Sequence, residues 1–240
     1  MMSMDQALLQ AGLRDLGLSA EPSQLAQFQA YAALLTDWNT RMNLTAITDA
    51  EGIAVKHFLD SVLPLAYFSF PDGLRVADIG TGAGFPGLPL KIMRPDLKLT
   101  LVDSLNKRVV FLTEVCRQLG LEGVTCIHAR AEELGRDRRH REAYDLVVSR
   151  AVANMTVLSE YCLPFVRVGG QLLALKAADI EDELRAAKPM IGNLGGAISG
   201  ITNAPLPQSD IVRNLVAVEK RHPTPPQFPR TAKRIQKGSS

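Results

Sequence analysis

The sequence predicts an α/β fold in which a mostly parallel sheet follows a helical N-terminal segment. Three observations support this prediction. From residue 74 onward, strand-like apolar runs alternate with helical segments, which is the order of parallel βαβ units. Most of these strands are continuous runs of Val, Ile and Leu, as expected when helices cover both faces of a sheet. A glycine-rich turn directly follows the first strand.

Residues 1–72 are expected to form a helical extension that packs on the rest of the chain. Between residues 25 and 42, apolar side chains recur at spacings of three and four, which places them on one face of a helix. Residues 53–68 repeat this pattern, and a Pro-Asp-Gly turn follows at 71–73. No strand pattern precedes that turn.

Residues 73–220 are expected to form the α/β core. The predicted strands lie at 75–79, 98–103, 123–128, 144–149, 170–176 and 212–219, and the predicted helices at 86–93, 106–119, 154–166 and 179–190. Residues 192–207 are rich in Gly and Pro and indicate an extra strand or a hairpin arm. The last strand therefore follows a hairpin-like segment without a crossover helix, which favours an antiparallel final strand.

Residues 221–240 predict a basic, extended, proline-containing tail. Four prolines within 222–230 exclude regular structure there. The residues that follow carry arginine and lysine without any acidic side chain. The net charge of the whole chain is only +2, which does not by itself indicate nucleic-acid binding.

The remaining composition predicts a cytoplasmic protein. The three cysteines are widely separated in apolar contexts, which favours buried thiols over a disulfide or a metal site. The N-terminus lacks the pattern of a signal peptide, and no run approaches the ~20 apolar residues of a membrane span. We therefore expect no metal and no membrane partner.

The glycine-rich turn at 78–87 indicates a nucleotide-like cofactor. Glycine permits positive φ angles and a close approach of the backbone to a ligand. Residues 82–87 fit the G-x-G-x-x-G pattern of dinucleotide enzymes. Residues 78–84 fit D-x-G-x-G-x-G, which is typical of S-adenosylmethionine-dependent methyltransferases. The candidate cofactor-binding glycines are Gly80, Gly82 and Gly84.

Three features favour the methyltransferase. Asp78 lies at the strand end, where dehydrogenases usually have an apolar residue. The glycine turn follows a helical segment instead of opening the chain, and the last strand follows a hairpin-like segment. A nicotinamide-dependent oxidoreductase and a glycine turn that serves only packing remain alternatives.

Asp103 is a candidate ligand of the cofactor ribose. It ends the second predicted strand, about 20 residues after the glycine turn, where a carboxylate accepts hydrogen bonds from ribose hydroxyls. A cap for the helix that begins near Lys107 is the alternative role.

Seven segments together resemble the GidB family of small-subunit ribosomal RNA methyltransferases. They are residues 42–48, 56–61, 78–87, 102–108, 129–133, 149–151 and 173–176, in family order. The resemblance implies a Rossmann-like class I S-adenosylmethionine-dependent methyltransferase with an antiparallel last strand. It also implies methyl transfer to N7 of a guanine in 16S rRNA, the one conventionally numbered 527.

The resemblance also implies particular cofactor-binding residues. They are Gly80, Phe85, Ala131, Glu132 and Arg150. Ala131 and Glu132 follow a strand at the carboxyl edge of the predicted sheet, where they are well placed to meet the adenine.

The acceptor side is less defined by the sequence. Arg150 follows the fourth strand, where it could clamp a phosphate or the carboxylate of the cofactor, and Lys176 could contact an RNA phosphate. His57 and Asp60 share a helix face and lie near the pocket or form a surface hydrogen bond. Because guanine N7 carries no proton, we assign no catalytic base.

The resemblance implies contact with 16S rRNA of the small ribosomal subunit, and basic residues could form a rim that makes this contact. They are Lys107, Arg108, the arginines of 136–141 and the basic residues from Lys220 to Lys237. A solvated charged face is the alternative for each basic cluster. A non-enzymatic RNA-binding assembly factor is an alternative, although such a protein need not keep the glycines and Asp103. We expect a monomer.

Overall fold

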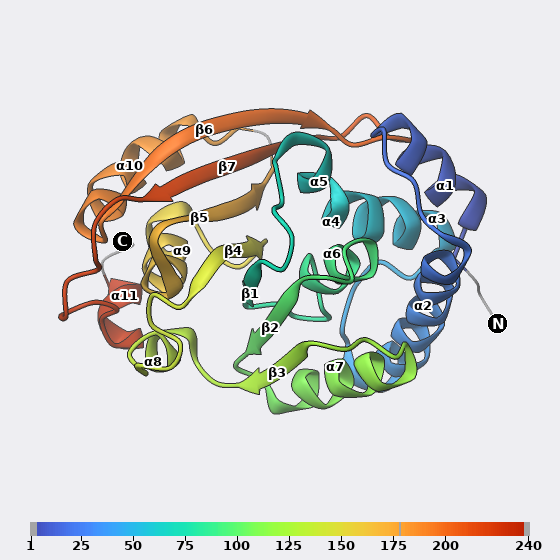
Figure 1. Cartoon of the computed structure of the whole chain (residues 1–240), viewed down its shortest axis with the longest axis horizontal. Coiled ribbons are helices and arrows are strands. Elements are labelled where there is room, and N and C mark those ends of the chain that lie inside the picture. Colours follow the sequence, from blue (N-terminus) through green and yellow to red (C-terminus); the bar gives the residue numbers. More distant parts are fainter. Residues whose placement is uncertain (1–3, 178, 238–240) are drawn as a thin grey trace.

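The computed structural model describes residues 4–177 and 179–237 and contains a seven-stranded mixed sheet. The strand order is β3-β2-β1-β4-β5-β7-β6 (Figure 1). The first five strands are parallel, and β7 is antiparallel to both β5 and β6. The strands are β1 (Arg75–Ile79), β2 (Lys98–Asp103), β3 (Val124–His128), β4 (Tyr144–Arg150), β5 (Val166–Lys176), β6 (Gly196–Pro205) and β7 (Val212–Lys220).

Helices cover both faces of this sheet, as the continuous apolar strands predict. The N-terminal ones are α1 (Gln6–Asp15), α2 (Pro22–Met42), α3 (Ala50–Gly52), the π-helix η1 (Ile53–Leu59), α4 (Asp60–Val62) and α5 (Pro64–Tyr67). Those of the core and tail are α6 (Gly87–Met93), α7 (Asn106–Gln118), α8 (Ala131–Leu134), α9 (Met155–Cys162), the 3-10 turn η2 (Leu163–Phe165), α10 (Glu181–Asn193) and α11 (Ala232–Lys237).

The predicted fold class is confirmed, with local differences. Residues 192–207 contain the edge strand β6. The helix predicted at 154–166 ends at Cys162, because Pro164 follows in a tight turn. The helix predicted at 53–68 is divided into a π-helical turn and two short helices, the second of which starts at Pro64. No helix of the described residues is both long and apolar enough to cross a membrane.

The apolar core has two parts, one on each face of the sheet. One part joins α1, α2, η1, α6 and α7 to the sheet, and the other joins α9 and α10 to it (Figure 1). The three cysteines are free thiols, and Cys162 is buried in the second part.

Helix α2 connects the N-terminal extension to the core. Pro22 occupies its first turn, and Asn43 ends it with a φ of 49°. The Tyr31 hydroxyl donates to the carbonyl of Ala83, inside the glycine turn. Farther along, the partly buried ring of Trp38 packs on Phe111 of α7, with ring centroids 5.5 Å apart. The extension therefore contacts the glycine turn directly.

The C-terminal segment packs on the core through buried charges. Fully buried Glu160 of α9 receives a two-pronged hydrogen bond from Arg230, at 2.7 and 3.0 Å. Arg141 donates to the carbonyls of Thr224, Pro225 and Phe228. Among the described residues, the extended-tail prediction is wrong for 232–237, which form α11. Residues 238–240 lie outside the described part.

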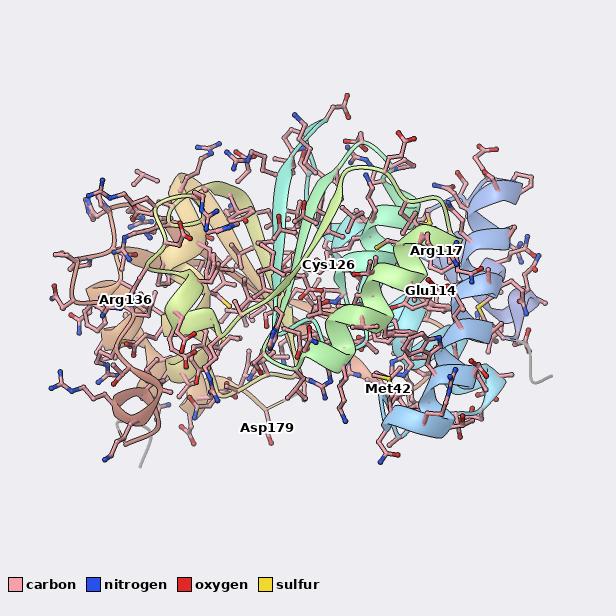
Figure 2. All side chains as sticks on the ribbon, turned by 90° about the horizontal axis from the view of Figure 1, so that it is seen from below. Met42, Glu114, Arg117, Cys126, Arg136 and Asp179 are labelled. Carbon is pink, nitrogen blue, oxygen red and sulfur yellow. The ribbon has the colours of Figure 1, made fainter. Side chains whose placement is uncertain are left out.

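The prediction that Lys220 belongs to the basic rim is wrong. Lys220 is fully buried and donates to the Leu163 carbonyl and the Thr224 hydroxyl, and burial lowers its pKa to about 8. Arg141 is engaged by the tail, and Arg136, labelled in Figure 2, donates to the Gln227 carbonyl. These three cations hold the tail on the core.

We expect Arg230→Met to destabilise the protein by about 3 kcal/mol, because it leaves a buried carboxylate without its partner. Urea unfolding at neutral pH measures this change. Arg221→Met is the matched control, since Arg221 pairs with Glu219 where both are more than two-fifths exposed, and an exposed pair contributes at most about 1 kcal/mol. Equal effects of the two substitutions would contradict a structural role for the Glu160 pair.

Candidate active site

Two adjoining cavities lie at the carboxyl edge of the parallel strands. The first, of about 480 Å³, is lined by residues at the ends of β1, β2 and β4 and by α8. The second, of about 410 Å³, is lined by residues at the ends of β4 and β5, the start of β7 and the start of α10. The cavities share His57, Arg150 and Ala151. This edge is where open α/β sheets bind their ligands.

The glycine turn forms one wall of the first cavity. Gly80, Gly82 and Gly84 have φ angles of 72°, 63° and 101°, which glycine adopts without strain. Gly80 and Gly82 line the cavity, and a Cβ on Gly82 would meet no atom within 4 Å. Gly84 is not among the lining residues, and a Cβ there would lie 2.5 Å from the Tyr31 hydroxyl. Gly84 therefore allows the turn to pack on α2.

Asp78 fixes the shape of the glycine turn through buried hydrogen bonds. It is fully buried, and its Oδ2 accepts hydrogen bonds from the Thr81 hydroxyl at 2.7 Å and the Gly87 amide at 2.8 Å. Its Oδ1 has no partner within the described residues. Burial raises the pKa of this carboxyl to about 7.

Asp103 lies opposite the glycine turn, in the first cavity. It accepts hydrogen bonds from the amides of Gly82 and Leu105, at 2.9 and 2.8 Å, and pairs with Arg108 at 3.3 Å. The residue that caps α7 is Leu105, so Asp103 is not the N-cap of that helix. Its carboxylate ties the ends of two strands together at the cavity wall.

The short helix α8 supplies the far wall of the first cavity. Ala131 and Glu132 form its first turn and line the cavity, and the Glu132 side chain is buried. Glu133, the next residue, is exposed and does not line it. The first cavity thus brings together four sequence-predicted residues, Gly82, Asp103, Ala131 and Glu132.

An aromatic wall divides the two cavities. The ring of His57 stacks on Phe85, with centroids 4.4 Å apart and planes within 7°. The Arg150 guanidinium carbon lies 4.9 Å from the same Phe85 centroid. Nε2 of His57 lies 2.8 Å from the Thr45 hydroxyl. Burial, and secondly the nearby Arg150, lowers the pKa of His57 to about 3, so its ring is neutral at pH 7.

A buried carboxylate holds this wall in place. Asp60 is 1% exposed and accepts from Arg150 at 3.0 Å and from Arg213 at 2.8 and 3.1 Å. The alternative of a surface hydrogen bond for His57 and Asp60 is wrong, because both side chains are buried. Sequence reasoning missed Arg213, which carries no motif and meets Asp60 only in the folded chain.

Lys176 lines the second cavity at the end of β5. Its Nζ lies 2.6 Å from Glu183 of α10 and donates to the Ala153 carbonyl at 2.9 Å. Glu183 was also missed by sequence reasoning, because an acid in the first turn of a helix is common for electrostatic reasons alone.

Comparison with known proteins gives consistent results. The family model described as GidB, rRNA small subunit methyltransferase G, matches residues 24–204. A protein of that name from Exiguobacterium sibiricum is 49% identical over 229 residues, covering 95% of this chain and 96% of the relative. The one from Moorella thermoacetica is 49% identical and covers 93% of each chain.

Solved structures share the fold at low identity. The structure of M. jannaschii TYW2 in complex with AdoMet matches with a TM-score of 0.51 and 16% identity, over 64% of this chain and 72% of that one. A SAM-dependent methyltransferase from Aquifex aeolicus matches with a TM-score of 0.50 and 17% identity, over 67% and 90%.

The fold and the family match together define a class I S-adenosylmethionine-dependent methyltransferase, as the glycine turn predicts. This result sets aside the oxidoreductase and the non-enzymatic assembly factor. The chain belongs to the GidB family, rRNA small subunit methyltransferase G.

The raised pKa of Asp78 predicts a pH-dependent stability. In the unfolded chain this carboxyl ionises near its ordinary pKa of ~3.9, whereas in the folded protein it ionises near 7. The folded state therefore binds more protons between these values, and the free energy of unfolding falls as pH rises through them, by about 4 kcal/mol. Asp78→Asn keeps an acceptor oxygen but does not titrate.

Urea unfolding of the wild type and of Asp78→Asn, from pH 4 to pH 8, measures this difference. We expect the wild type to lose stability relative to the variant as pH rises. A difference that stays constant across this range would show that Asp78 titrates near its ordinary pKa.

Proposed function

We propose that this enzyme transfers a methyl group from S-adenosylmethionine to N7 of a guanine in 16S rRNA of the small ribosomal subunit, the guanine conventionally numbered 527. The observation that carries this proposal is the meeting of two cavities at one wall, formed by Phe85, His57 and Arg150. One cavity suits the methyl donor, and the other suits a base. Membership of the family supports the RNA substrate.

The first cavity fits the methyl donor. Its volume lies in the range of ~300–1,000 Å³ that is usual for small-ligand sites. In this proposal the Asp103 carboxylate binds the ribose hydroxyls, and Ala131 and Glu132 meet the adenine edge. Gly80 and Gly82 let the backbone approach the ligand, while Gly84 keeps the turn packed on the extension.

The remaining residues meet the reactive end of the donor. Phe85 and Arg150 lie where the two cavities join, and Arg150 there suits the carboxylate of the donor. When bound, the cofactor supplies an electrophilic methyl group.

The acceptor chemistry needs no general base. N7 of guanine carries a lone pair and no proton, so no residue has to remove one. The protein aligns the two reactants, and orientation of this kind lowers a barrier by up to ~7–11 kcal/mol. The neutral ring of His57 and the pairing of Arg150 with Asp60 limit the positive charge at the wall. This limit matters because the methylated base is a cation.

His57, Arg150 and Lys176 line the second cavity and are the proposed acceptor-side residues. Lys56 is exposed at the same cavity and is placed to meet an RNA phosphate. We propose that the enzyme acts as a monomer. A ribosomal substrate supports action in the cytoplasm.

The function is tested by incubating the protein with methyl-labelled S-adenosylmethionine and separated ribosomal subunits. We expect label in the RNA of the small subunit, at a guanine that becomes sensitive to borohydride and aniline cleavage, as 7-methylguanosine does. Label confined to the large subunit, or to an atom other than N7, would overturn the proposal.

Substitutions of two adjacent glutamates, Glu132 and Glu133, test the proposed donor site. We expect Glu132→Gln to weaken S-adenosylmethionine binding about tenfold, since a hydrogen bond to a charged group contributes roughly 1.5–3 kcal/mol. Isothermal titration calorimetry measures the affinity. Glu133→Gln is the matched control, because Glu133 is exposed and outside the cavity. Equal S-adenosylmethionine affinities for both variants would show that Glu132 does not bind the donor.

A further inference from the structure

The second cavity, of about 410 Å³, is the proposed site of the acceptor base and is called the slot below. It lies between η1 and the start of α10, over the ends of β5 and β7. Ile47, Leu175 and Ile180 contribute apolar lining. Asp179, on the loop after β5, is exposed at the outer edge of the molecule (Figure 2) and also lines this cavity. A cavity with an apolar part, beside the proposed donor site, suits a base that has left its stack.

Lys176 and Glu183 form a donor and acceptor pair in this slot. The Lys176 Nζ and Glu183 Oε1 are 2.6 Å apart, and the two side chains are 12% and 25% exposed. The Met155 amide donates to the same Oε1, which fixes the carboxylate at the start of α9. Within the described residues, Oε2 of Glu183 makes no hydrogen bond. One ammonium and one carboxylate oxygen therefore remain able to bind a ligand edge.

The order of groups around the slot matches the order of atoms around guanine. N7, O6 and N1 follow one another along two edges of the purine. The shared wall at Arg150 ends β4, Lys176 ends the neighbouring strand β5, and Glu183 follows on α10. With N7 directed at the wall, O6 faces Lys176, and the N1 and N2 protons face Glu183.

We propose that the Lys176–Glu183 pair selects guanine in the second cavity. This inference rests on the proposed function and names the residues that read the acceptor base. The Lys176 ammonium donates to O6, which is an acceptor, and Oε2 of Glu183 accepts from N1–H and the N2 amino group. The pair acts on the base edge opposite the sugar and leaves N7 free for the methyl group.

Adenine presents the reverse pattern. Its exocyclic amino group would face the ammonium, and the N1 lone pair would face the carboxylate. The ammonium would then face a donor and Oε2 of Glu183 would face an acceptor, in a partly buried site. Sites that hydrogen-bond a substrate group reject analogues without it by up to ~10⁴–10⁵-fold. The partial exposure of this pair leads us to expect about 100-fold.

The experiment uses reconstituted small subunits in which the target nucleotide is guanine or 2-aminopurine. 2-Aminopurine keeps N7 and the amino group at C2 but lacks O6 and the N1 proton. Single-turnover methyl transfer is measured at saturating S-adenosylmethionine. For the wild type we expect guanine to react about 100-fold faster than 2-aminopurine.

Glu183→Gln tests the carboxylate, and Glu181→Gln is its matched control on the first turn of the same helix. Glu181 is exposed and does not line the cavity. We expect Glu183→Gln to slow the guanine reaction at least tenfold and to reduce the preference over 2-aminopurine to tenfold or less. Glu181→Gln should leave the guanine rate and the preference over 2-aminopurine unchanged. The S-adenosylmethionine affinity should stay at the wild-type value in Glu181→Gln and in Glu183→Gln.

Lys176→Gln provides the second variant. It removes the donor to O6 and should slow the guanine reaction while leaving the slow 2-aminopurine reaction unchanged. If Glu183→Gln and Lys176→Gln both keep the wild-type preference for guanine over 2-aminopurine, the inference is overturned. The proposed function would still stand. A fall in donor affinity equal to the loss of rate would also overturn the inference, by assigning the pair to the donor side. A wild-type enzyme that methylates no guanine would overturn the proposed function itself.

Discussion

The buried carboxylate of Asp60 is the interaction on which the site depends. It belongs to the N-terminal extension, and it receives arginines from β4 and β7. Removing one partner of a buried ion pair lowers the free energy of unfolding strongly, because the other charge is left buried and unpaired. The intact pair contributes much less net stability than this loss. The pair therefore keeps the extension docked over the strand ends. Asp60 also balances the positive charge of Arg150, which lines both cavities.

The local parts of the site could be predicted from the sequence. The glycine turn, Asp103 and the first turn of α8 each follow a strand, and parallel strands bring their carboxyl ends to one edge. The alternation of strand and helix patterns predicts the α/β class, and the absence of a crossover helix before residues 212–219 predicts the antiparallel last strand. The pattern of Gly and Pro also indicated the region of β6.

The parts that escaped prediction depend on contacts between distant residues. Asp60 and Arg213 are 153 residues apart in sequence, and no local pattern marks them as partners. Lys220 is predicted to lie in the basic rim, yet it is buried, and so is Glu160, because the C-terminal segment returns to the core. A charge alone gives no indication of whether a partner will cover it. Glu183 likewise becomes informative only once β5 places Lys176 beside it.

Trp38 has a consequence for spectroscopy. It is the single tryptophan of the chain, and it sits where α2 of the extension meets α7 of the core, outside both cavities. Its emission therefore reports whether the extension is docked, with no direct contribution from ligands in either cavity. The fluorescence of this enzyme separates loss of assembly from loss of binding without any added label.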